Sequence, residues 1–338
     1  MQYRPLGRSG LQVSELCLGT MTFHGGTGMW QNIGQLGQSD ADEIVKTAFD
    51  GGINFFDTAN VYSEGGSEEM LGQSLKNLGL NRHEVVIASK GFGRMHDGPN
   101  GRGASRYHII DACKASLKRL GVDHIDLYQL HGFDFDTPID EQMEALDILV
   151  KHGHVRYVGV SNWAGWQLAK AQGYAERRGT SPIRTIQSYY SLAGRDVERE
   201  VLPAAKAEGV GMLCWSPLAG GYLSGKYTGN DAEAEGRRAE FDFPPIDKDQ
   251  ADGIVGVMKE IASAKGVSVP QVALAWLLSR DGVSSVIVGA KKVSQLKDNL
   301  GATEVDLSDD DLSKLDKASA LPSAYPQWMF ETQSGRTD

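Results

Sequence analysis

The chain has 338 residues, of which 41% are hydrophobic and 23% charged, the profile of an ordinary globular protein. Acidic residues (44) outnumber Lys and Arg (34), and a formal net charge of −10 argues against nucleic-acid binding as the main role. No apolar stretch approaches a membrane span, and the N-terminus lacks the basic start and apolar run of a signal peptide. Three widely separated cysteines (Cys17, Cys113 and Cys214) fit a reducing compartment. We therefore expect a cytoplasmic protein without nucleic-acid or membrane partners.

The chain opens with a hairpin-like segment and continues as short apolar runs between longer amphipathic stretches. Residues 3–13, turned at Gly7-Arg8-Ser9-Gly10, predict an N-terminal β-hairpin. The apolar runs that follow predict eight strands, at residues 16–18, 54–57, 85–90, 125–130, 155–161, 185–188, 211–215 and 285–288.

Helical patterns fill the intervals between these strands. Ser39 and the acidic residues after it predict a helix that runs to Phe49 and ends at Gly51-Gly52. Residues 105–120 place apolar side chains at helical spacing, and Gly121 stops that helix. Further helices are expected to begin at Ser67 and at residues 137–138, and to cover residues 248–265 and 270–279.

This alternation predicts an α/β fold, a single (β/α)₈ TIM barrel over residues 1–338 with the N-terminal hairpin outside it. The long interval before the eighth strand requires an insertion, placed at residues 224–247, and residues 319–338 are expected to form a C-terminal tail near the substrate pocket. The alternative is a doubly wound open sheet. Its glycine-rich fingerprint should follow the first strand, but the sequence there, Gly19-Thr20-Met21-Thr22-Phe23, does not match it.

Polar residues stand at the predicted strand ends, which in a barrel meet at one mouth. The second strand ends in Asp57, with Tyr62 shortly after it, the third in Lys90 and the fourth in His131. Asp57 and Lys90 could be a structural ion pair that only closes the barrel. The accumulation of polar and aromatic strand ends at one mouth favours a catalytic role instead.

These four residues suit hydride transfer to a carbonyl group. Negative charge develops on the oxygen as hydride arrives, so an acid must supply a proton and a donor must hold the oxygen. Tyr62 can be the acid, Lys90 can stabilise its tyrosinate, Asp57 can fix Lys90, and His131 can donate to the carbonyl oxygen. The device needs no metal, and His152-Gly153-His154 lacks nearby partners for one.

The chain resembles the aldo-keto reductase superfamily from residue 6 to residue 299, in the branch that includes bacterial aldo/keto reductases and potassium-channel β-subunits. The likeness is carried in combination by residues 52–62, 117–128, 159–162 and 215–227. It implies a catalytic tetrad of Asp57, Tyr62, Lys90 and His131, and an NADPH-dependent enzyme that reversibly reduces aldehydes or ketones to alcohols.

The resemblance also implies a cofactor site. Ser161, Asn162 and Gln187 would bind the nicotinamide carboxamide, Trp215 would stack on the ring, and Thr20, Met21 and Asp57 would line the same pocket. The pyrophosphate would lie on the loop that contains Ser216, Pro217, Leu218, Gly220 and Lys226, with Arg237 or Arg238 as a clamp. Asp298 and Asn299 would hold the adenine edge, and the ribose 2′-phosphate would be approached by Gly289, Ala290, Lys291 and Gln295.

Gln295 stands where many family members have an arginine, so the preference for NADP(H) depends on Lys291, which could also be only a solvated helix start. Trp30, Phe92 and Phe133 are candidate walls of a pocket for a small carbonyl or alcohol. Two other functions stay open at this point: a nucleotide-binding regulatory module with little turnover, and a Schiff-base aldolase that uses Lys90. The sequence leaves the oligomeric state open.

Overall fold

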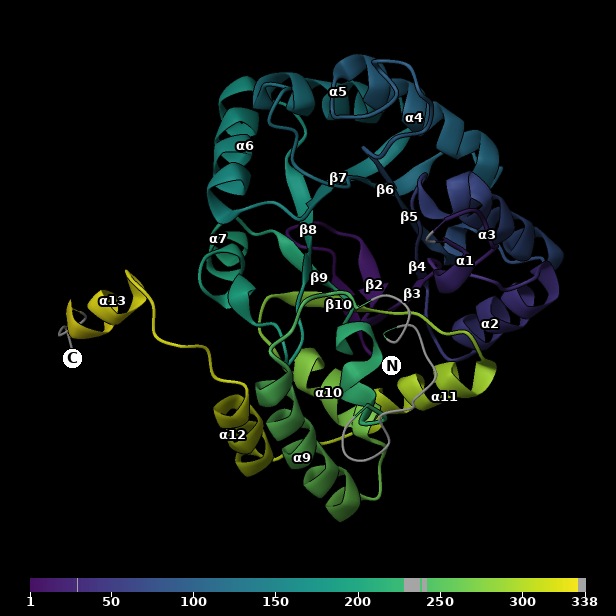
Figure 1. Cartoon of the computed structure of the whole chain (residues 1–338). Coiled ribbons are helices and arrows are strands. Elements are labelled where there is room, and N and C mark those ends of the chain that lie inside the picture. The colour runs from purple at the N-terminus through teal and green to yellow at the C-terminus, as the bar shows by residue number, and fades with distance from the viewer. Residues whose placement is uncertain (29, 228–237, 239–241, 334–338) are drawn as a thin grey trace.

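A closed eight-stranded parallel barrel forms the centre of the protein (Figure 1). The structure is a computed structural model, which describes residues 1–28, 30–227, 238 and 242–333. Around the barrel the strands follow the order β10-β3-β4-β5-β6-β7-β8-β9. Their bounds are Leu16–Gly19 (β3), Phe55–Asp57 (β4), Val86–Gly91 (β5), Ile125–Leu130 (β6), Val155–Ser161 (β7), Ile183–Tyr189 (β8), Gly211–Trp215 (β9) and Val283–Val288 (β10). The predicted barrel is confirmed, and its closure excludes the open doubly wound sheet.

The N-terminal hairpin is also confirmed. β1 (Tyr3–Pro5) pairs antiparallel with β2 (Gln12–Ser14) as a separate two-stranded sheet. Leu6 and Val13 are fully buried and belong to the same apolar cluster as barrel residues such as Phe55 and Leu213. The hairpin therefore contributes to the core inside the barrel.

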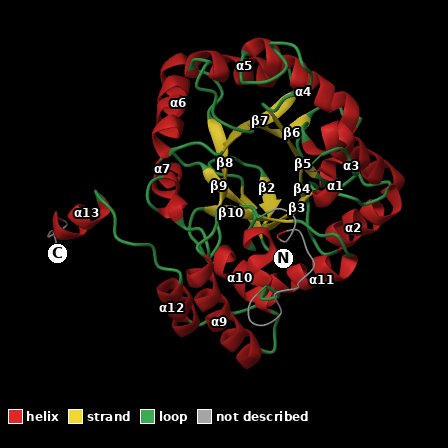
Figure 2. Cartoon of the chain, viewed as in Figure 1, coloured by secondary structure: helices red, strands yellow, loops and turns green. Residues whose placement is uncertain are grey.

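Helices surround the barrel as an outer ring (Figure 2). Those that follow the strands in turn are α1 (Trp30–Ile33), α2 (Gln38–Asp50), α3 (Gly66–Asn77), α4 (Arg106–Leu120), α5 (Ile139–Lys151), α6 (Gly165–Arg178), α7 (Val201–Ala207), α9 (Lys248–Lys265), α10 (Val269–Leu278) and α11 (Val293–Gly301). The predicted Ser39 cap of α2 is wrong: α2 begins at Gln38, its N-cap is Gly37, and no side chain caps it. The predicted caps of α4 are confirmed. For α4, the Ser105 side chain accepts from the His108 backbone N–H, and Gly121 ends the helix at a φ of 64°.

Two helices follow the ring, α12 (Asp309–Ala318) and α13 (Gln327–Gln333). α13 lies apart from the barrel on the side of α7 (Figure 1), where the Gln327 side chain donates to the Arg199 carbonyl at 2.8 Å. In the described part of the chain, no single helix is long and apolar enough to cross a membrane. Only α9 and α10 taken together reach that length and hydropathy, and they meet at a bend of 98°.

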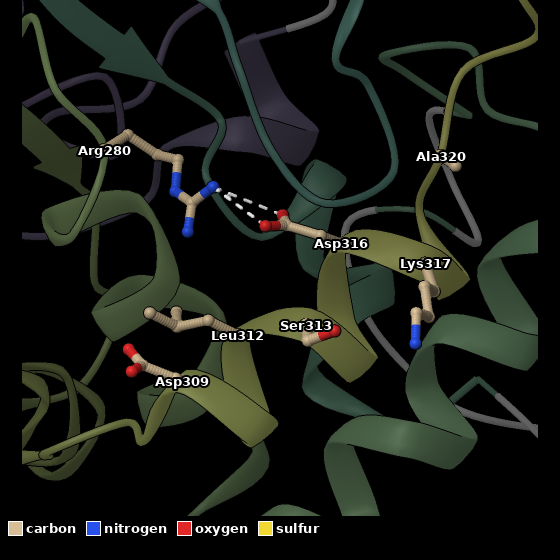
Figure 3. Close-up of a pocket in the computed structure, with 7 residues that line it drawn as sticks. All are labelled: Arg280, Asp309, Leu312, Ser313, Asp316, Lys317 and Ala320. Atoms are coloured by element: carbon tan, nitrogen blue, oxygen red, sulfur yellow. Dashed lines mark hydrogen bonds and ion pairs between the residues drawn. The ribbon is translucent and has the colours of Figure 1, made fainter.

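Asp316 on α12 ties that helix to the body of the protein. Its carboxylate accepts from both Arg280 and Arg195, each at 3.2 Å, and from the indole N–H of Trp276 at 3.0 Å. A surface cavity of about 500 Å³ opens beside this ion pair, and Figure 3 shows the side chains that line it. Five of its seven lining residues belong to α12, and none of the seven is a predicted site residue.

Candidate active site

Lys90 is the centre of the polar group at the mouth of the barrel. Its side chain is fully buried, and its ammonium donates to Asp57 Oδ1 at 2.5 Å, to the Thr58 carbonyl at 3.0 Å and to the Tyr62 hydroxyl at 3.3 Å. Burial by itself lowers the pKa of Lys90. The Asp57 carboxylate and the contact with Tyr62 outweigh that effect, so the pKa lies above its ordinary value. Lys90 therefore presents a positive charge to Tyr62.

Asp57 is held by two carboxamides inside the barrel as well as by Lys90. Gln187 donates to Asp57 Oδ2 at 3.0 Å and Gln129 donates to the same oxygen at 3.2 Å. Gln129 is not among the residues predicted from the sequence. It is a polar residue within an apolar strand, two positions before His131 and thus on the same face, and this pattern could have revealed it.

Tyr62 begins a short turn, Tyr62–Gly65, between β4 and α3. Its ring meets the edge of the His131 ring at a centroid separation of 5.7 Å and lies 5.8 Å from the Trp30 ring. The structure thus brings together all four residues of the predicted tetrad, and it adds Trp30 beside the tyrosine.

His131 is a neutral imidazole at physiological pH. Burial, and then the positive charge of Lys90, lower its pKa from 6.5 to about 3. A neutral imidazole has one N–H to donate, and it can hold a carbonyl oxygen without itself taking up a proton.

The residues expected around a nicotinamide ring lie on neighbouring strands. Ser161 pairs with Gln187 in the β7–β8 register, and the buried Ser161 hydroxyl has no hydrogen-bond partner among the described residues. Asn162 has a φ of 59°, and its side chain accepts from the Trp215 indole N–H at 2.9 Å and donates to the His131 carbonyl at 3.3 Å. One amide thus links Trp215 to the histidine of the tetrad.

Trp215 already has aromatic neighbours. The Phe243 ring is parallel to it within 8° at 5.7 Å, and the Tyr189 ring lies 5.1 Å away. Thr20 is fully buried, and its hydroxyl bonds to the Asp57 carbonyl and to Ser67, while Met21 beside it is partly exposed.

The loop expected to hold phosphates is tightly wound. Ser216, Ala219, Gly220 and Gly221 all have positive φ values, and the Ser216 hydroxyl accepts from the Gly220 N–H at 2.9 Å. The Lys226 ammonium lies over the Tyr227 ring at 4.9 Å. Pro217 and Leu218 belong to the same turn, in which the Leu218 carbonyl accepts from the Gly221 N–H.

Of the two candidate clamps, Arg237 lies outside the described residues. Arg238 is buried, and its guanidinium donates to the carbonyls of Ala219 and Pro244, each at 2.7 Å. It also pairs with Asp242 at 3.0 Å. Arg238 therefore stabilises the conformation of the loop that contains Ala219.

The residues expected to hold the adenosine end follow β10. Gly289 and Ala290 lead to Lys291, whose backbone N–H donates to the Gln295 side chain at 3.0 Å. The Asp298 carboxylate accepts from Ser268 at 2.8 Å and from Gln271 at 3.1 Å, and it thereby braces the start of α10. Asn299 beside it is buried, whereas Lys291 and Gln295 are exposed.

The three candidate pocket walls differ in their surroundings. Trp30 is next to Tyr62, and Phe92 packs near Gly132 in the segment after His131. Phe133 belongs to an aromatic group with Phe135, Trp163 and Trp166 at the start of α6, with centroid separations of 4.9–6.0 Å. Trp30 is thus the candidate wall whose ring lies beside a tetrad residue, Tyr62.

An Asp–Lys–Tyr–His group at the mouth of an eight-stranded parallel barrel defines an oxidoreductase of the aldo-keto type. Residues 15–320 match the Aldo/keto reductase family, and the chain belongs to it. It is 41% identical to an uncharacterized oxidoreductase, YrpG, of Bacillus subtilis (strain 168), over 96% of this chain and 99% of that protein.

Other relatives carry different names. A probable voltage-gated potassium channel subunit beta of Arabidopsis thaliana is 39% identical over 90% of this chain and 92% of its own length. Versiconal hemiacetal acetate reductase of Aspergillus parasiticus is 32% identical over 96% of this chain and 99% of its own length. The predicted family and branch are confirmed.

Proposed function

We propose that this oxidoreductase uses NADPH to reduce the carbonyl group of small aldehydes or ketones, reversibly, with Tyr62 as the general acid. The observation that carries the proposal is the buried Lys90 ammonium, which lies 3.3 Å from the Tyr62 hydroxyl and is fixed by Asp57. A cation at this distance stabilises the tyrosinate that remains after proton transfer.

The cofactor site is part of the proposal, and the described residues fit a nicotinamide dinucleotide. The buried Ser161 hydroxyl has no hydrogen-bond partner within the described part of the chain, which is costly unless a bound group supplies one. Asn162 and Gln187 have carboxamide side chains beside it, and Trp215 offers an aromatic surface. Ser216, Ala219, Gly220 and Gly221, all at positive φ, turn backbone groups in the manner of an anion-binding loop.

Bound NADPH would supply hydride to the carbonyl carbon, with two electrons. Tyr62 then delivers the proton to the developing alkoxide, which becomes an alcohol. Lys90 holds the resulting tyrosinate, and Asp57 holds Lys90. His131, neutral because of its low pKa, donates its one N–H to the same oxygen and orients it.

The geometry opposes the aldolase alternative. A Schiff-base lysine needs a lowered pKa so that a neutral amine can attack. Lys90 instead donates three hydrogen bonds, and its pKa lies above the ordinary value.

A regulatory role is the second candidate, because a relative at 39% identity is named as a potassium channel subunit beta. The complete tetrad supports turnover as well as binding.

We also propose a cytoplasmic location, because the described cysteines Cys17, Cys113 and Cys214 are buried and free, as in proteins of a reducing compartment.

The proposal is tested by following NADPH oxidation across a panel of aldehydes and ketones, and NADP⁺ reduction across the matching alcohols. We expect turnover with some members of the panel in both directions. NADPH binding without turnover on any carbonyl would favour the regulatory module. The Tyr62→Phe variant is the matched control for background oxidation.

A further inference from the structure

The turn that carries Tyr62 is conformationally strained. Ser63, Glu64 and Gly65 follow it with φ values of 49°, 58° and 100°. Two successive non-glycine residues in the left-handed region are unfavourable unless the surroundings hold them there. On one side they are held by the Ser63 hydroxyl, which donates to the Phe23 carbonyl at 3.0 Å, and by Glu64, which accepts from Thr27 at 2.6 Å.

On the other side the turn rests on a buried ion pair. Glu68, in the first turn of α3, is fully buried, and it accepts from the Arg119 guanidinium at 2.6 Å and from the Ser89 hydroxyl. The stem of Arg119 lies directly against Gly65, because a Cβ added there would come within 2.7 Å of Arg119 Cδ. One carboxylate therefore joins α3, β5 and the end of α4 behind the turn.

Ser89 connects this ion pair to the tetrad. It immediately precedes Lys90 on β5, and successive side chains of a strand point to opposite faces. Ser89 thus faces Glu68 on α3, while Lys90 faces the interior. The hydrogen bond from the Ser89 hydroxyl to Glu68 therefore holds the β5 backbone that carries the Lys90 side chain.

The hydrogen bond between Tyr62 and Lys90 is sensitive to small displacements of either residue. The Tyr62 hydroxyl and the Lys90 ammonium are 3.3 Å apart, slightly beyond the usual range for an N–H···O bond. A small displacement of the Tyr62 turn or of β5 would therefore break the contact.

We propose that Glu68, together with Arg119, is a positioning residue that sets the separation between Tyr62 and Lys90. The inference rests on the proposed function, since Tyr62 and Lys90 are its proton-delivery pair. Apolar packing alone could dock α3, which already buries Leu71 and Leu75 in the core. A buried carboxylate with two directed partners adds specificity of position, which apolar contacts do not give.

The test compares four variants. Glu68→Ala removes both contacts, and Ser89→Ala removes only the link to β5. Glu68→Gln can keep both, because its carbonyl oxygen can accept from Arg119 and its amide can donate to the Ser89 hydroxyl. Leu71→Ala is the matched control: it truncates a buried side chain one turn along the same helix without touching the ion pair.

Each variant is measured for kcat, KM, NADPH affinity, Tm and the titration of the Tyr62 phenol. The chain has 11 tyrosines, so the Tyr62 titration is isolated as the ultraviolet difference between each variant and the same variant carrying Tyr62→Phe. This spectroscopic measurement does not depend on turnover.

We expect Glu68→Ala to lower kcat by about tenfold or more and to leave NADPH affinity within about twofold, because only the geometry of proton delivery changes. Its Tyr62 titration should move to higher pH by roughly one unit, as the contact with the ammonium weakens. Ser89→Ala should show a smaller change in the same direction. Glu68→Gln should retain the kcat and the Tyr62 titration of the unmodified protein. Leu71→Ala should lower Tm without moving the Tyr62 titration.

A Glu68→Ala protein with a lower Tm but the unmodified kcat and Tyr62 titration would overturn the proposal, because Glu68 would then be only structural. If Glu68→Ala does not fold, an unshifted titration in Ser89→Ala has the same meaning. A shifted titration together with full turnover in Tyr62→Phe would instead overturn the proposed function and leave the positioning role standing.

Discussion

Lys90 and Asp57 form a buried ion pair 2.5 Å long at the mouth of the barrel, with side chains 0% and 3% exposed. Gln129 and Gln187 complete the coordination of the carboxylate, and Thr58 and Tyr62 complete that of the ammonium. The Lys90 ammonium thus donates three hydrogen bonds, one of which goes to the Tyr62 hydroxyl.

Replacing Tyr62 by phenylalanine should abolish carbonyl reduction and leave NADPH binding nearly intact. The hydroxyl is the proposed proton source, whereas the cofactor would depend on Trp215, Ser161 and their neighbours. Steady-state kinetics and a fluorescence titration with NADPH measure the two properties separately. Retention of most of the turnover would remove Tyr62 from the mechanism.

Replacing Lys90 by methionine should stop turnover while the barrel still folds. The substitution leaves Asp57 as a buried charge without its cation, and loss of one partner of such a pair costs about 3–5 kcal/mol. We therefore expect a lower Tm together with a native circular dichroism spectrum. In the unmodified enzyme, borohydride added with a carbonyl substrate should trap no adduct on Lys90, and a trapped adduct would establish the aldolase chemistry instead.

His131 should make the protein less stable as the pH falls below about 6.5. Its pKa is about 3 in the folded state and close to 6.5 when unfolded, so between these values the unfolded chain binds a proton that the folded chain does not. The loss begins near the unfolded pKa and increases toward the folded one. Tm measured from pH 7 to pH 5 should fall more steeply in the unmodified protein than in His131→Gln, and parallel curves would show that His131 titrates normally.

NADPH should bind more tightly than NADH because the exposed Lys291 follows β10, where the ribose 2′-phosphate would lie. A charge-assisted contact of this kind is worth about 1.5–3 kcal/mol. With Gln295 in place of a second cation, we expect the lower end, or about one decade of affinity. Lys291→Ala should weaken NADPH and hardly affect NADH. Equal affinities for the two cofactors in the unmodified protein would show that this lysine is only solvated.

The fold was accessible from sequence because its signals are local. The capped helix over Arg106–Leu120 and the predicted bounds of β6, β7 and β9 appear in the structure as expected. The prediction that strand ends converge also brought Asp57, Lys90 and His131 together correctly. It needed only the rule that parallel strands of a barrel present their carboxyl ends at one mouth.

The roles of Arg238, Gln129 and Glu68 were not accessible in this way. Arg238 resembles a surface cation in sequence, yet in the structure it is buried and its guanidinium donates to the carbonyls of Ala219 and Pro244. Gln129 and Glu68 stand in segments whose visible pattern is that of an ordinary strand and an ordinary helix start. Their partners come from other elements, 72 residues away in one case and 51 in the other.

The sequence by itself determined which residue types stand at the barrel mouth and in what order, because hydrophobic periodicity and capping are properties of short segments. Only the tertiary structure decided the distances among Tyr62, Lys90 and Asp57, and the contacts behind the strained turn that carries Tyr62. The contacts behind the turn join α3, β5 and α4, and closure of the barrel brings these elements together. A spacing along the chain does not specify where a side chain lies once it packs against another element, and the proposed proton transfer depends on that placement.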